Sequence, residues 1–181
     1  MSRCDRSIVV DANLMRSAGG DSSTGQRPAL CRDFLKTLLL LDRFCVVRTP
    51  DIYREWKRHW SRFARIWYVS MEARKKVLRP TILAFHEDVK NDLEAWAPSE
   101  TERLAILKDA HLVVAALAAD MRIASLDEAL RSMLGASCAN CSQVCDLLWT
   151  NPEIWEESAE EWLKNGAPVE ASRTLLGHSN P

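Results

Sequence analysis

Four acidic residues stand at places where a folded chain could bring them together: Asp11, Glu55, Asp109 and Asp127. Like charges that crowd together repel, so a cluster of carboxylates is stable only where cations hold it. Hard divalent ions such as Mg²⁺ or Mn²⁺ prefer oxygen ligands and leave coordination positions open for water and phosphate oxygens. The chemistry that such a site supports is metal-assisted hydrolysis of phosphodiester bonds.

The elements expected around these acids form an alternating pattern of strands and helices. Apolar runs at 7–11 and 44–48 predict buried strands, and 122–127 predicts a third strand. A fourth strand is expected over 142–149, and helical spacing of apolar residues fills the intervals between the strands. This alternation predicts an α/β fold, with a mostly parallel central sheet of four or more strands flanked by helices.

The predicted sheet explains why the acids should meet. In open parallel sheets, binding sites form at the carboxyl ends of the strands. Asp11 and Asp127 end the first and third strands, and Glu55 lies on the helix that follows the second. Asp109 is expected at or near the N-terminus of an apolar helix that leads into the third strand. All four side chains should therefore approach one edge of the sheet.

Three segments of the chain carry a family resemblance. In order and spacing, "IVVDANL", "TPDIYREW" and "KDAHLVVAALAADMRIASLD" resemble the three motif blocks of the PIN-domain nucleases, which include the toxins of VapBC toxin–antitoxin systems. The resemblance covers about residues 7 to 150 and implies a PIN-like, Rossmann-like sandwich. It implies that the four acids form the family's catalytic and metal-binding quartet, with Asn13 and Ser125 at its polar supporting positions.

The resemblance also implies an activity and its partners. The expected protein is a Mg²⁺- or Mn²⁺-dependent endoribonuclease acting on RNA, with single-stranded DNA left open as a substrate. If the chain is a toxin of this kind, an antitoxin protein should block the site, and homodimers are common in the family. One alternative is a PIN-fold scaffold that binds RNA or protein with little catalysis. Another is a phosphotransfer enzyme with an Asp-x-Asp motif, although Asn13 occupies the second position here.

Charge is unevenly distributed along the chain. The total is −1, so no global field indicates a nucleic-acid or membrane partner, but residues 54–79 carry nine Lys or Arg against two acids. We expect the phosphate backbone of a substrate to contact the basic residues nearest the acids: Arg54, Lys57, Arg58 and Arg62. Four aromatic residues at helical spacing, 56, 60, 63 and 67, either stack on bases or, as is more common, pack in the core.

One domain is expected over 1–166, followed by a flexible tail at 167–181. Its last element, 151–166, is an acidic helix that either docks on the domain or forms a lid or a protein-binding surface. The chain shows neither a signal-peptide pattern nor a membrane span, which predicts a cytoplasmic location without membrane association. In that compartment the six cysteines are expected to be thiols, and 138, 141 and 145 either pack or hold a structural metal.

Overall fold

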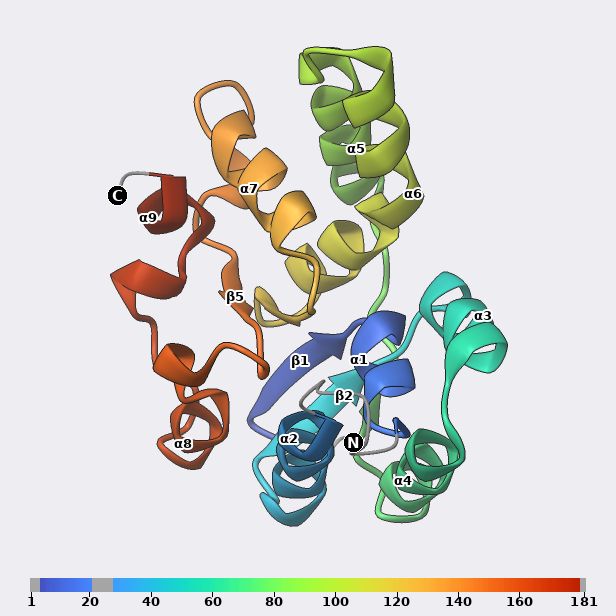
Figure 1. Cartoon of the computed structure of the whole chain (residues 1–181). Helices are drawn as coiled ribbons and strands as arrows, with labels where there is room; N and C mark the ends of the chain where they lie inside the picture. The colour runs from blue at the N-terminus through green and yellow to red at the C-terminus, as the bar shows by residue number, and fades with distance from the viewer. Residues whose placement is uncertain (1–3, 21–27, 180–181) are drawn as a thin grey trace.

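The computed structural model describes residues 4–20 and 28–179, and its centre is a five-stranded sheet (Figure 1). All neighbouring strands are parallel, in the order β3-β2-β1-β4-β5. The strands are β1 (Arg6–Val10), β2 (Phe44–Val47), β3 (Val77–Leu78), β4 (Arg122–Ala124) and β5 (Leu148–Thr150). The predicted α/β class with a parallel central sheet is therefore confirmed.

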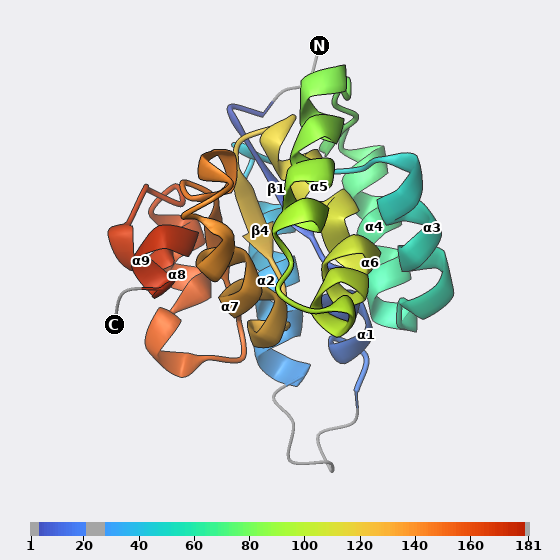
Figure 2. The ribbon, with the colours of Figure 1, turned by 90° about the horizontal axis from the view of Figure 1, so that it is seen from above.

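Helices cover both faces of this sheet. They are α1 (Ala12–Ser17), α2 (Pro28–Leu40), α3 (Pro50–His59), α4 (Arg62–Ala73), α5 (Ala84–Trp96), α6 (Glu100–Leu117), α7 (Glu128–Ser137), α8 (Ala159–Lys164) and α9 (Leu175–Ser179). Figures 1 and 2 show α5, α6 and α7 on one side of the sheet and α2 with α4 on the other. The layered arrangement explains why β1 and β2 are almost entirely buried, as their continuous apolar sequences require.

The four aromatic residues at 56, 60, 63 and 67 pack in the core or against it, Trp56 and Trp67 buried and Trp60 and Phe63 partly buried. Their helical spacing does not come from one continuous helix, because α3 ends at His59 and Ser61 caps α4 by accepting a hydrogen bond from the Ala64 amide. Trp56 and Trp67 are buried, and each indole donates to a backbone carbonyl. The rings therefore stabilise the packing of two helices and do not form an exposed platform for bases.

Two further elements differ from the sequence expectation. Helix α6 is continuous and begins at a cap from Ser99, so Asp109 lies in its second half and not at its N-terminus. The strand expected over 142–149 is mostly a 3₁₀ turn at Ser142–Val144, and β5 begins only at Leu148. Cys145 consequently lies outside the strand, where its thiol donates to the carbonyl of Cys138.

The end of the described chain is ordered into the fold. The helix expected over 151–166 is a 3₁₀ turn at Trp155–Glu157 followed by α8. The prediction of a flexible tail is wrong for residues 167–179. Thr174 forms an antiparallel β-bridge with Leu148, and α9 packs against α7. Residues 180–181 lie outside the described residues.

A disulfide joins Cys4 to Cys45, which corrects the expectation that every cysteine is a thiol. The parallel register sets Ser7 beside Cys45, so the residues that lead into β1 run close to β2. The remaining four cysteines are thiols. Across 4–20 and 28–179, no helix has both the length and the apolar character needed to cross a membrane.

Candidate functional site

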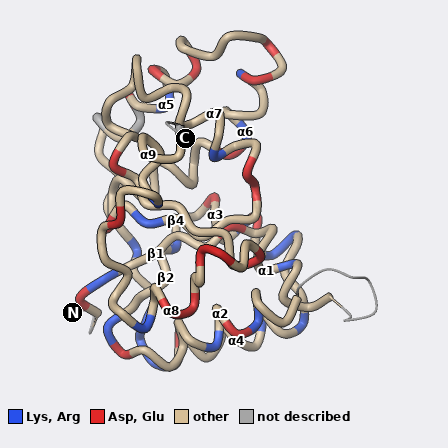
Figure 3. The backbone as a smooth tube through the Cα atoms, turned by 60° about the vertical axis from the view of Figure 1, so that its left-hand side comes forward, with Lys and Arg blue, Asp and Glu red and all other residues tan. Residues whose placement is uncertain are grey.

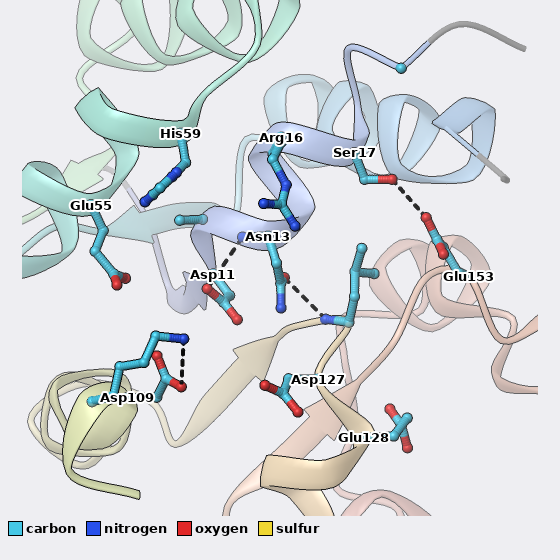
Figure 4. A pocket seen from close by; sticks show the side chains of 14 residues that line it. Asp11, Asn13, Arg16, Ser17, Glu55, His59, Asp109, Asp127, Glu128 and Glu153 are labelled. Carbon is cyan, nitrogen blue, oxygen red and sulfur yellow. Dashed lines mark hydrogen bonds and ion pairs between the residues drawn. The ribbon is translucent and has the colours of Figure 1, made fainter. Parts of the chain in front are cut away.

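All four predicted acids line one pocket of about 820 Å³ at the carboxyl ends of β1 and β4 (Figure 4). Asp11 directly follows β1, and Asp127 lies just beyond β4. Glu55 reaches the pocket from α3 and Asp109 from α6. Figure 3 shows several acidic segments of the chain, in red, close to α1. The topology of the sheet thus brings together acids that are far apart in the sequence.

Ser125 is the centre of a hydrogen-bond network between the two strand ends. Its hydroxyl donates to Oδ2 of Asp11 at 2.6 Å and accepts from Nδ2 of Asn13 and from the Asp127 amide, each at 3.1 Å. The Asn13 amide oxygen in turn accepts from the backbone of Leu126 at 3.1 Å. Both residues predicted to support the acids therefore contact them or the backbone that carries them.

Two of the carboxylates also cap helices. Asp11 accepts a hydrogen bond from the Asn13 amide at the start of α1, and Asp127 accepts one from the Leu130 amide, at 2.8 Å, at the start of α7. A cap fixes the position of the carboxylate relative to the end of its strand. Glu128, next to Asp127, instead accepts from the side chain of Asn151 at 3.0 Å.

Burial makes the pocket unfavourable for negative charge. It raises the pKa of Asp109 to about 6, an effect that Lys108 opposes and that the charges of Asp11 and Glu55 reinforce. Burial also raises the pKa of Asp11, whereas the hydrogen bond from Ser125 lowers it. Ionised carboxylates in such a setting would be stabilised by a cation placed between them.

His111 is a member of the site that the sequence analysis did not identify. Its Nε2 lies 3.1 Å from a carboxylate oxygen of Glu55. This hydrogen bond lowers the pKa of Glu55 despite partial burial. Burial lowers the pKa of His111, but the hydrogen bond and the charge of Glu55 outweigh it and leave the pKa raised. The pair forms across α3 and α6, so no local sequence pattern signals it.

The four predicted substrate-binding cations are not equivalent. Arg54 and Arg58 line a second pocket that adjoins the first. Lys57 lies over the ring of Tyr53, 4.9 Å from its centroid, and Arg62 is exposed at the start of α4. Neither Lys57 nor Arg62 is among the residues that line the two pockets. The structure thus places only two of the four beside the acids.

The donor set suits Mg²⁺ or Mn²⁺, because it consists of carboxylate oxygens and lacks the thiolate and imidazole set typical of zinc. Asp11, Asp109 and Asp127 would be the principal ligands, with Glu55 beside them. Within the described ranges, however, no three His, Cys, Asp or Glu side chains form a group that could hold one metal ion. Metal binding is therefore an inference from the chemistry of the donors.

Comparison with known proteins does not assign the chain to a family. No protein-family model, curated protein or solved structure matches the chain.

Proposed function

We propose that the protein is a metal-dependent endoribonuclease that hydrolyses phosphodiester bonds in the acidic pocket. The observation that supports this most strongly is the convergence of Asp11, Glu55, Asp109 and Asp127 on one pocket from four different elements. Burial there raises the pKa of two of the carboxyls, an unfavourable arrangement that a divalent cation would relieve. A purely structural role does not account for such a cluster.

The side chains around the acids would have defined tasks. A bound Mg²⁺ or Mn²⁺ would supply Lewis-acid activation of water and stabilisation of the leaving oxygen. Ser125 orients Asp11 and holds the backbone of Asp127, and Asn13 fastens the two strand ends together. His111 orients Glu55 through their hydrogen bond. This reaction needs no covalent nucleophile.

RNA is the proposed substrate, and single-stranded DNA is the nearest alternative. The three sequence segments support this choice, together with the cations Arg54 and Arg58 in the adjoining pocket. The same resemblance suggests an antitoxin protein as inhibitor and a homodimer as assembly. A cytoplasmic location remains a prediction from the sequence pattern.

The decisive experiment is cleavage of a mixed pool of single-stranded and structured RNAs with Mn²⁺ and with chelator. Asp11→Asn should abolish the products, because it removes one carboxylate and keeps an oxygen that can cap α1. Asp33→Asn is the matched control: Asp33 lies on α2, outside both pockets, and is paired with Lys36 at 3.0 Å. It should leave cleavage unchanged. Binding of RNA without metal-dependent cleavage by the wild type would contradict the proposal and favour an RNA-binding scaffold.

A further inference from the structure

A second pocket of about 570 Å³ lies beside the acidic one. The two share Glu55, His59 and Lys108, so they form neighbouring parts of one surface. Helices α3 and α6, which lie side by side in Figure 2, provide most of its lining. Ile82, which precedes α5, and Lys90, in the middle of α5, complete the lining. The volume is in the range of sites for small organic ligands.

The charge of this basic pocket is opposite to that of its neighbour. Four permanent cations line it, from three helices: Arg54, Arg58, Lys90 and Lys108. Its two acids are already paired, Asp51 with a cation at 2.7 Å and Glu55 with His111 at 3.1 Å. In the described part of the chain, neither Arg58 nor Lys90 forms an ion pair with a carboxylate. The pocket therefore has positive charge to offer to an anion.

The basic pocket is also lined by apolar side chains. Pro50, Ile82, Leu107 and Val114 contribute to its lining. Cations alone would attract any polyanion, whereas apolar side chains next to cations match the two parts of a nucleotide, a charged phosphate and a flat base. Ile82 and Leu107 are only partly buried, so they remain available for contact.

We propose that the basic pocket binds an unpaired nucleotide next to the phosphodiester bond that is cut. Its phosphate contacts Arg58 and Lys90, and its base packs against Ile82 and Leu107. A base inside a duplex is stacked and paired, so it cannot enter such a cavity without leaving the helix. This inference rests on the proposed nuclease function and adds a nucleotide subsite, beside the acidic pocket, for the strand that is cut.

Binding in the presence of chelator tests this assignment without any cleavage. The probe is a fluorescein-labelled single-stranded RNA of about ten nucleotides, a length within the range of single-strand binding sites, and the readout is fluorescence anisotropy. Arg58→Ala and Lys90→Ala should each weaken binding about fivefold at 0.1 M salt, since a phosphate contact contributes about 0.7 to the salt slope. Arg58 is exposed, so its variant should fold normally.

Lys57→Ala is the matched control, because Lys57 precedes Arg58 on α3 but lies over Tyr53, outside both pockets. Its affinity should stay within about twofold of the wild type. Equal losses from Lys57→Ala and Arg58→Ala would show that the helix attracts RNA through its overall charge, and would overturn the proposal. Leu107→Asn should weaken binding without changing the salt slope. An unchanged affinity would contradict the proposed contact between the base and Leu107.

The remaining arms separate this inference from the proposed function. A duplex of the same length should bind at least fivefold more weakly than the single strand; equal binding would overturn the proposal. Displacement of the RNA by polyglutamate at equal charge concentration would indicate an acidic protein partner instead. If the wild type cleaves RNA but the Arg58 and Lys90 variants bind RNA like the wild type, the nuclease proposal stands and the nucleotide site is overturned. If both variants lose binding and the wild type does not cleave RNA, the nucleotide site stands and the nuclease proposal is overturned.

Discussion

The indole nitrogen of Trp56 donates a 2.9 Å hydrogen bond to the backbone carbonyl of Val10. Trp56 follows Glu55 on α3, and Val10 is the last residue of β1, immediately before Asp11. Both hydrogen-bonded residues are fully buried. The bond therefore holds together the two backbone segments that carry Glu55 and Asp11, and a core contact sets the spacing of two carboxylates in the pocket.

Trp56→Phe should loosen this spacing. The variant keeps an aromatic ring, loses the donor and leaves a small cavity, so we expect a loss of about 2 kcal/mol in the free energy of unfolding. Loss of the supporting contact should also weaken Mn²⁺ binding about tenfold or more, measured by titration calorimetry.

Trp67→Phe separates the two effects. The Trp67 indole also donates to a buried carbonyl, that of Leu35, but this contact joins α4 to α2 and lies away from the pocket. We expect a similar loss of stability with Mn²⁺ affinity unchanged. Equal affinities in the two variants would show that the Trp56 contact has no effect on the acids.

Ser125→Ala should remove the link between the strand ends. Ser125 is fully buried and forms hydrogen bonds with Asp11, Asn13 and Asp127. We expect a stability loss of about 2 kcal/mol and a 10- to 100-fold loss of cleavage. Since this hydrogen bond lowers the pKa of Asp11, the acidic limb of the pH–rate profile should move to higher pH. Ser137→Ala, a buried serine whose hydroxyl donates to a carbonyl within α7, should lose stability and keep its cleavage rate.

Asp109→Asn should stabilise the protein at neutral pH in the presence of chelator. The folded-state pKa of Asp109, about 6, exceeds the ordinary value of 3.8. The stability linked to this proton is fully present below pH 3.8 and is lost as the pH rises through 6. At pH 7.5 the wild type therefore carries a cost of up to about 3 kcal/mol that the amide removes.

Chemical unfolding at pH 7.5 and near pH 4 tests this sign, because the difference between the two proteins should nearly vanish at the lower pH. A variant less stable than wild type at pH 7.5 would contradict it. Adding Mn²⁺ should then stabilise the wild type by mass action, and stabilise Asp109→Asn much less.

Glu157→Gln should destabilise the attachment of the C-terminal elements to the rest of the fold. Glu157 is largely buried and accepts from Arg131, Arg173, Thr150 and the Asn151 amide. Removing its charge leaves Arg131 with Glu128 and Arg173 with Glu170 as their remaining carboxylate partners. The lost charge-assisted hydrogen bonds should cost about 1.5 to 3 kcal/mol in the free energy of unfolding, measured with urea.

The matched control is Glu160→Gln, which breaks an exposed pair with Lys164 one turn away on α8. It should cost about 0.5 kcal/mol or less. If both variants melt alike, the network around Glu157 does not secure the C-terminal elements.

The strands of the sheet were predictable where the local sequence alone signals a buried strand. The continuous apolar runs of β1 and β2 signal burial on both faces. The strand β3 has only two residues, Val77 and Leu78, and two residues carry no periodicity. The break between α3 and α4 leaves the aromatic spacing intact because both helices pack on the same core, and only Ser61 signals it locally.

The site was predictable to the extent that strand ends define it. Asp11 and Asp127 lie where parallel topology requires, whereas Asp109 reaches the same pocket from the interior of α6. Contacts between helices that are distant in the sequence bring three further residues to the two pockets: His111, Lys90 and Lys108. No local sequence motif indicates such contacts. The disulfide was missed for the same reason, since strand register and not spacing brings Cys4 to Cys45.

The central position of β1 in the sheet has a consequence for synthesis of the chain. Its partner β4 follows more than a hundred residues later, and Asp127 comes after β4. While the ribosome is still translating α6, the nascent chain holds Asp11 and Glu55 without the strand that closes the pocket. A truncated product ending before Asp127 would lack part of the acid set. The acidic pocket is therefore completed only late in translation, after the basic residues of α3 and α4 have been synthesised.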